Sequence, residues 1–180
     1  MAAHPPPLKF RIEIAGLAIA LELPPGAVAE QIRARYADFL TADSPARLTI
    51  RVRLLPGAQF IPAQPGAWVI ETEMRAGRVS FRSYREQGWA DFSSGTGALE
   101  IAPEADPENY LRVLYAWLAL ADDGLLLHAA GVIRDGQAYV FYGPSGAGKS
   151  TTARHSLQYT VLSDDLVLVR RIAGEWRAFG

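Results

Sequence analysis

The first hundred residues mostly alternate between apolar and polar side chains, which is the period of β-strands. Phe10 to Leu23 alternates and then becomes apolar, and a turn at Gly16-Leu17 predicts a hairpin or a bent pair of short strands. Arg47 to Leu55 sets arginine and threonine against leucine, isoleucine and valine, which predicts a half-buried strand. Further strands are expected at Trp68 to Met74, Arg78 to Tyr84 and Ala98 to Ala102, the first two joined at Arg75-Ala76-Gly77.

Two segments repeat their apolar residues with the period of a helix. The first, Ala27 to Leu40, gathers five large side chains on one face: Val28, Ile32, Tyr36, Phe39 and Leu40. The second begins at Asp106-Pro107, with Asp106 as N-cap, and should run to about Ala121 and stop at Gly124. We therefore expect a small α+β module at residues 1–102, a boundary at 103–107 and a second domain at 103–180.

The second domain has its own order of elements. Leu125 to Ile133 and Ala138 to Tyr142 are β-rich runs on either side of a turn signal, so they predict an antiparallel hairpin. Ser150 to Tyr159 can form a short helix, and Val161 to Val169 is an apolar strand. Arg170 to Phe179 predicts a further hairpin that turns at Ala173-Gly174.

Composition narrows the class of protein. The 180 residues carry a net charge of −1, which argues against a nucleic-acid partner, although arginines form a stripe on the strand at 47–55. The absence of cysteine excludes disulfides and thiolate metal sites. Met1 to Lys9 lacks the apolar core of a signal peptide, and the apolar run Tyr110 to Ala121 is too short to span a bilayer. We expect a soluble cytoplasmic protein with no membrane partner.

One stretch fits the pattern G-x-x-x-x-G-K-[ST], the Walker A motif or P-loop that holds nucleotide phosphates. Its residues are Gly143, Pro144, Ser145, Gly146, Ala147, Gly148, Lys149, Ser150 and Thr151. Glycines let backbone N–H groups face phosphate oxygens, Lys149 reaches the β- and γ-phosphates, and the Ser150 hydroxyl ligates Mg²⁺. Because only two of eighteen basic residues are lysines, a chance lysine at 149 is disfavoured. We expect ATP and Mg²⁺ as cofactors rather than an ordinary glycine-rich turn.

Two acidic residues follow the motif closely. Asp164 and Asp165 stand in the apolar strand Val161 to Val169, the setting of a metal-binding Walker-B-type site. Adjacent side chains on a regular strand point to opposite faces, so both can reach one site only if the strand ends or bulges there. The alternative is that the pair forms an Asx-type turn at the start of a strand.

This arrangement resembles the HPr kinase/phosphorylase family, whose fold is shared with phosphoenolpyruvate carboxykinase. The resemblance covers about 126–169 and is carried by Leu127 to Val132, by Gly143 to Thr151 and by Leu162 to Asp165. It implies an α+β or α/β chain in which the small module precedes a partial P-loop nucleotide-binding lobe. It also implies that one of Asp164 and Asp165 binds the metal while the other accepts the proton of an attacking hydroxyl. His128 would match a family histidine near the phosphates; the alternative is a hydrogen-bonded core histidine.

The family's kinase fold continues where this chain ends, so the resemblance leads us to expect a truncated or minimal relative with an open sheet edge and an incomplete site. The first hypothesis for function is an ATP-dependent kinase that phosphorylates a serine hydroxyl of a protein or peptide. A nucleotide-binding regulatory or assembly module and a small-molecule kinase are the alternatives, and a homo-oligomer is left open. A GTPase is disfavoured because the N-K-x-D motif is missing. The carboxykinase chemistry is disfavoured because the chain lacks the necessary Lys/His set.

Overall fold

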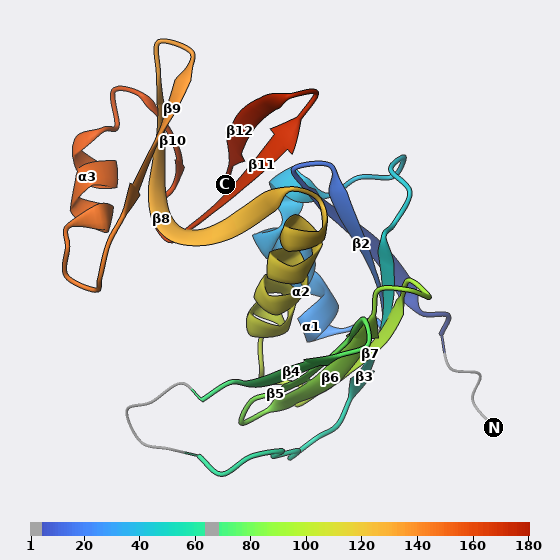
Figure 1. The fold of residues 1–180 in the computed structure, drawn as a ribbon. Helices are drawn as coiled ribbons and strands as arrows, with labels where there is room; N and C mark the ends of the chain where they lie inside the picture. The colour runs from blue at the N-terminus through green and yellow to red at the C-terminus, as the bar shows by residue number, and fades with distance from the viewer. Residues whose placement is uncertain (1–4, 64–68) are drawn as a thin grey trace. The chain divides into compact units, whose positions relative to one another are not determined.

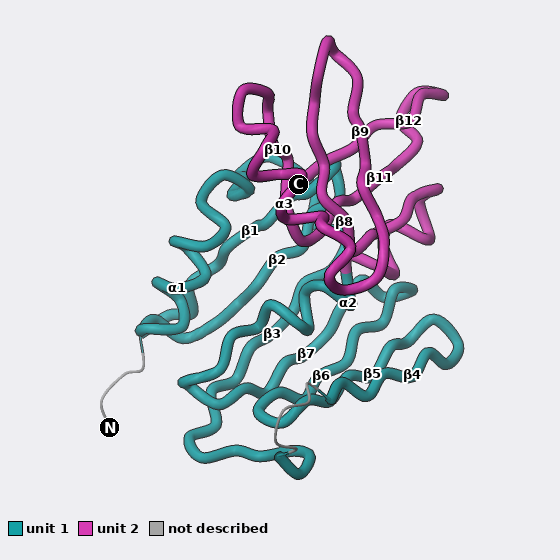
Figure 2. Tube along the Cα trace, turned by 90° about the vertical axis from the view of Figure 1, so that its left-hand side faces the viewer, with its two compact units in different colours: residues 1–114 teal, residues 115–180 magenta. Residues whose placement is uncertain are grey.

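A computed structural model describes residues 5–63 and 69–180. Over these residues the fold is mixed α+β, with two sheets and three α-helices, and most of the regular structure is strand (Figure 1). The chain divides into two compact units, unit 1 at residues 1–114 and unit 2 at residues 115–180 (Figure 2). The expected domain boundary at 103–107 stays a prediction. No helix in the described part of the chain is long and apolar enough to cross a membrane.

Unit 1 is built on a seven-stranded sheet with the order β1-β2-β3-β7-β6-β5-β4, seen in teal in Figure 2. The strands are β1 Leu8–Ile14, β2 Leu17–Leu23, β3 Leu48–Leu54, β4 Glu71–Arg75, β5 Arg78–Arg82, β6 Glu86–Asp91 and β7 Thr96–Ile101. The pairs β2–β3 and β3–β7 are parallel and the other pairs are antiparallel. The hairpins predicted at 10–23 and 68–84 are present. Trp68 and residues 1–4 of the stretch Met1 to Lys9 lie outside the described residues.

The crossover from β2 to β3 carries a helix that is shorter than the sequence predicts. Helix α1 spans Ala27–Arg35 and buries Val28, Ala29 and Ile32. At Tyr36 the backbone leaves the helical region (φ −105°, ψ 21°), and the chain continues as the single 3₁₀ turn Ala37–Phe39. That turn brings Leu40 into a bridge with Ile12 of β1. The predicted continuation of the helix to Leu40 is therefore wrong, because pairing with the sheet replaces the last helical turn.

Strand β6 was not predicted, since its sequence Glu86–Asp91 contains a glycine and little alternation. The glycine of this strand, Gly88, is required by the atoms packed against it. A Cβ at this position would lie 2.8 Å from the ring of Tyr110 and 2.8 Å from the carbonyl oxygen of Ala98. Tyr110 belongs to helix α2, Glu108–Ala121, and its hydroxyl donates to the carbonyl of Trp89 (2.7 Å). The strand therefore has glycine because an aromatic ring packs on its backbone.

Helix α2 begins as predicted, because the Asp106 carboxylate accepts a hydrogen bond from the N–H of Glu108 (2.9 Å), the contact of an N-cap. It also ends at Ala121 as predicted, but Gly124 does not have the predicted role of stopping it. The left-handed residue after the helix is Asp123 (φ +52°), whereas Gly124 is already the first residue of β8. A Cβ at Gly124 would lie 2.8 Å from the carbonyl oxygen of Val169. Gly124 is therefore explained by close strand packing and not by a helix stop.

Unit 2 is organised around the long strand β8, Gly124–Arg134, which Figure 1 shows bending between its two halves. Its other elements are β9 Gln137–Tyr142, α3 Lys149–His155, β10 Thr160–Ser163, β11 Leu166–Ile172 and β12 Glu175–Phe179. The first half of β8 pairs with β11, and the second half pairs with β9 on one side and β10 on the other. The predicted antiparallel hairpin before the glycine-rich stretch is confirmed, with its turn at Asp135 (φ +52°) and Gly136 (φ +75°). The hairpin at 173–174 is also present.

Candidate functional site

The stretch from Gly143 to Thr151, called the glycine-rich loop below, connects β9 to α3. Gly146 (φ +81°) and Gly148 (φ +89°) have left-handed backbones, which glycine adopts without strain. A Cβ at either position would meet no atom within 4 Å, so neither is a glycine for lack of space. Gly143 differs, because its Cβ would come within 3.0 Å of the Ala147 side chain. The loop therefore closes on itself at Gly143 and leaves open space beside Gly146 and Gly148.

Lys149 lies at the start of α3 and is only 9% exposed. Its ammonium group donates to the carbonyl oxygens of Gly143 (2.9 Å) and Pro144 (3.2 Å). These bonds place the Nζ atom across the first turn of the glycine-rich loop. The positive charge is thereby held at the loop by the loop's own backbone.

The two aspartates lie at a break between strands. Ser163 of β10 pairs with Gly131, and Leu166 of β11 pairs with His128, so both strands follow the same line along β8. The register of β10 against β8 shifts between Val161 and Ser163. Asp164 and Asp165 follow this bulge and lie between the end of β10 and the start of β11. The single predicted strand Val161 to Val169 is therefore wrong, because a bulge and a turn divide it. This break is the condition under which neighbouring side chains can reach one site.

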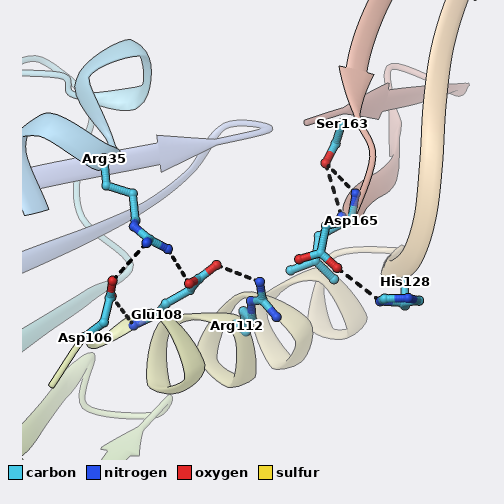
Figure 3. A network of polar contacts seen from close by, with 8 residues as sticks. Arg35, Asp106, Glu108, Arg112, His128, Ser163 and Asp165 are labelled. Atoms are coloured by element: carbon cyan, nitrogen blue, oxygen red, sulfur yellow. Dashed lines mark hydrogen bonds and ion pairs between the residues drawn. The ribbon is translucent and has the colours of Figure 1, made fainter. Parts of the chain in front are cut away.

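The turn at this break is closed by Ser163. Its hydroxyl oxygen accepts hydrogen bonds from the N–H groups of Asp165 (3.2 Å) and Leu166 (3.1 Å), as Figure 3 shows. The side-chain acceptor of these two hydrogen bonds is a serine, as in an ST-type turn. Ser163 was not among the predicted site residues, although a serine two or three residues before a strand start is the signal of such a turn.

His128 lies on β8 opposite the break. Its side chain is 63% exposed, so it is not the core histidine that the sequence left as an alternative. The Nδ1 atom lies 3.2 Å from Oδ1 of Asp165 (Figure 3). An imidazole at this distance from a carboxylate can share a proton with it.

A single cavity of about 450 Å³ in unit 2 brings these segments together. It is lined by nine residues: His128, Ser145, Gly146, Gly148, Lys149, Ser150, Thr151, Asp164 and Asp165. Three of the predicted residues, Gly143, Pro144 and Ala147, do not line it. Residues from β8, from the glycine-rich loop and from the β10–β11 break thus face one space, although they are up to 37 positions apart in the sequence.

The residues around this cavity do not form a complete metal site by themselves. Within the described residues no group of three or more His, Asp or Glu side chains could hold an ion. The cavity offers two carboxylates and the Ser150 hydroxyl. That set suits Mg²⁺, which keeps several waters and is usually held by one or two carboxylates together with substrate phosphates.

Comparison with known proteins gives one family. Residues 108–179 match the family model of the SynChlorMet cassette protein ScmC, a match that covers less than half of the chain. No curated protein matches the chain. The resemblance to the HPr kinase/phosphorylase family is therefore wrong: the matching family is ScmC and not an HPr kinase family. The strand, loop and aspartate pattern that carried that resemblance lies within the matched residues 108–179.

Proposed function

We propose that unit 2 binds ATP with Mg²⁺ as a P-loop lobe and transfers the γ-phosphoryl group to a hydroxyl acceptor. The observation that carries the proposal is the shared cavity, in which a glycine-rich loop, its lysine and two aspartates face one another. Phosphoryl transfer needs little besides positioning and charge stabilisation, and these residue types supply both.

The glycine-rich loop supplies the phosphate contacts. The open space beside Gly146 and Gly148 allows phosphate oxygens to approach the backbone N–H groups closely. The Lys149 ammonium would exchange its bonds to the Gly143 and Pro144 carbonyls for bonds to the β- and γ-phosphates. Because Lys149 is buried, solvent screens its charge only weakly, and this strengthens the contact between its ammonium group and the phosphates.

The Ser150 hydroxyl and at least one carboxylate of Asp164 and Asp165 would hold Mg²⁺ beside the phosphates. When bound, Mg²⁺ neutralises the charge that develops on the transferred group. Because the protein offers two carboxylates, the ion should bind with the nucleotide and only weakly without it.

In the transfer step the bond between the γ-phosphorus and its bridging oxygen to the β-phosphate breaks. A bond forms between the γ-phosphorus and the acceptor oxygen, the acceptor proton passes to Asp164 or Asp165, and ADP leaves. His128 would position the Asp165 carboxylate through the 3.2 Å contact and offer a second site for the proton.

The acceptor is proposed only as a hydroxyl group. A serine of a protein or peptide was expected on the resemblance to the HPr kinase family, and that support is lost. Incubation with γ-labelled ATP, Mg²⁺, seryl peptides and small polyols should therefore give label on one class of acceptor. Label on polyols alone would indicate a small-molecule kinase.

The controls of this experiment decide the function. Transfer should be lost in the Asp164→Asn and Asp165→Asn variants and kept in Asp135→Asn, a matched change at an exposed carboxylate in the β8–β9 turn. Tight ATP binding without transfer to any acceptor would contradict the kinase and favour a regulatory nucleotide-binding module. Absence of ATP binding would contradict both.

A further inference from the structure

A second cavity, of about 800 Å³, lies entirely within unit 1. It is formed where the turn between β5 and β6 meets the start of α2. Part of its wall is apolar and includes Ile70, Tyr84 and Ala105. Nothing in the proposed nucleotide-binding activity of unit 2 uses this cavity.

Four carboxyl groups line this cavity, and three of them have an arginine partner. The pairs are Glu104 with Arg85 (2.7 Å), Glu108 with Arg112 (2.6 Å) and Asp106 with Arg35 (3.1 Å). Figure 3 shows Arg35 lying between Asp106 and Glu108, with Arg112 on the other side of Glu108. The charges of these three carboxylates are therefore balanced within the unit.

Glu86, the fourth carboxyl, differs from the others. It is only 2% exposed, and its Oε2 atom accepts a hydrogen bond from the Ser83 hydroxyl (2.9 Å). Its Oε1 atom is buried without a hydrogen-bond partner among the described residues. A buried carboxyl oxygen left unsatisfied is unfavourable, and in native proteins such a group calls for an explanation. Since Glu86 lines the cavity, a ligand there can supply the missing donor.

We propose that the unit 1 cavity binds a small ligand that carries a primary ammonium group on an apolar body, with the ammonium donating to Oε1 of Glu86. The ammonium is favoured over a guanidinium by the state of the carboxyl. A guanidinium fork binds best to two free carboxylate oxygens, whereas Oε2 is already taken by Ser83. An ammonium is a compact charge that needs only one acceptor. The apolar body would contact Ile70, Tyr84 and Ala105.

Binding of such a ligand should release a proton. Burial, opposed by the Ser83 hydrogen bond and reinforced by the neighbouring charges of Asp106 and Glu108, raises the pKa of Glu86 to about 7. Glu104, Arg85 and Arg112 are the other charged groups around the cavity. A cation beside the Glu86 carboxyl favours its ionised form, so binding at pH 7, where about half of the carboxyl groups are protonated, should expel up to about half a proton.

The proposal is tested on the whole chain with 3-methylbutylammonium chloride as probe and 3-methylbutanol as its neutral counterpart. In a ¹H–¹⁵N NMR titration at pH 7 the amine should give saturable shifts at the amides of residues 83–86, 105, 106, 108 and 109. The alcohol should bind the native chain about tenfold more weakly than the amine does, because it cannot form the charge-assisted hydrogen bond. The amine should bind the Glu86→Gln variant about tenfold more weakly than the native chain for the same reason. Calorimetry in two buffers of different ionisation enthalpy should show the proton released.

Glu104→Gln is the matched control, since it removes one charge from a carboxylate of the same cavity that already has Arg85 as partner. It should change the affinity for the amine by no more than about twofold. Equal binding of amine and alcohol, equal losses in the Glu86 and Glu104 variants, or no saturable shift would each overturn the proposal. The comparison of the two probes uses the native chain, so it holds even if a variant does not fold. ATP is absent throughout, so the result is independent of unit 2.

Discussion

The two cavities of this protein differ in how their polar groups are satisfied. In unit 2, His128 is 63% exposed and Asp165 is 45% exposed at the side chain, and Asp164 is exposed. In unit 1, three carboxylates are matched to arginines and the fourth is buried. Exposed polar groups contribute little to stability, whereas a buried carboxyl has a large effect on it. Substitutions of His128, Asp164 and Asp165 should therefore alter ligand binding and chemistry, whereas substitution of Glu86 should alter stability first.

The largest effect is expected at the two aspartates of unit 2. Asp164→Asn and Asp165→Asn should each lower the rate of phosphoryl transfer by about 10²- to 10⁴-fold, the usual contribution of a general base or metal ligand. The free energy of unfolding should change by less than about 0.5 kcal/mol, because both side chains lie at an exposed turn. Rates measured over a series of Mg²⁺ concentrations separate the roles, since excess Mg²⁺ should restore part of the activity only when a metal ligand is lost. A large loss of stability with an unchanged rate of phosphoryl transfer would contradict the role proposed for these aspartates.

The next largest effect is expected at Glu86 of unit 1, as a change in the free energy of unfolding that depends on pH. The carboxyl of Glu86 has an ordinary pKa of 4.5, and burial raises its pKa in the folded chain to about 7. The folded state therefore holds the proton more tightly, and the associated stability is lost as the pH rises from about 4.5 to 7. Relative to the native chain, Glu86→Gln should gain up to about 3 kcal/mol between pH 4 and pH 8. Urea unfolding at both pH values measures this difference, and equal differences would show that the group is not perturbed by burial.

A smaller effect is expected at Gly148, where substitution can show whether the glycine serves the backbone conformation alone or also contacts the phosphates. Gly148→Ala places a Cβ on a left-handed residue in open space, which costs about 1 kcal/mol of stability. Gly174→Ala in the β11–β12 turn is a matched control, because its φ of +86° is close to the +89° of Gly148 and its surroundings are equally open. Thermal unfolding should show similar losses for both variants, and only Gly148→Ala should weaken ATP binding. Equal ATP affinity in the two variants would argue against phosphate contact at Gly148.

The smallest effect concerns the acidic start of α2. Asp106→Ala removes the N-cap contact with Glu108 and the ion pair with Arg35, and should lower the free energy of unfolding by about 1 kcal/mol. Asp106→Asn keeps a capping oxygen and loses the charge, so it should cost only a few tenths of that amount. Denaturant unfolding of both variants distinguishes cap from ion pair. Equal losses would indicate that the ion pair dominates.

The same contrast explains what could be predicted from the sequence. The glycine-rich loop is one contiguous pattern, so its position between a strand and a helix followed from residues 143–151 alone. The break at Asp164 and Asp165 lies where β10 ends and the Ser163 turn begins, which the apolar pattern of residues 161–169 does not reveal. In unit 1, Glu86 and the start of α2 are some twenty residues apart, and strand β6, which begins at Glu86, pairs with β5 and β7 although its sequence does not alternate. The unit 1 cavity was therefore not predictable, and the resemblance drawn from the unit 2 pattern led to the wrong family.

The central claim is that the glycine-rich loop of unit 2 binds the phosphates of ATP, and a calorimetric titration with ATP and Mg²⁺ tests it most directly. Lys149→Ala should weaken the affinity by about 10- to 100-fold, the loss of one or two charge-assisted hydrogen bonds. Lys9→Ala is the matched control, because Lys9 is the other lysine of the chain and its 71% exposed side chain lies in unit 1, paired with Glu22. The account predicts native affinity for Lys9→Ala and weak binding for Lys149→Ala. Equal affinities in the two variants, or no binding by the native chain, would contradict it.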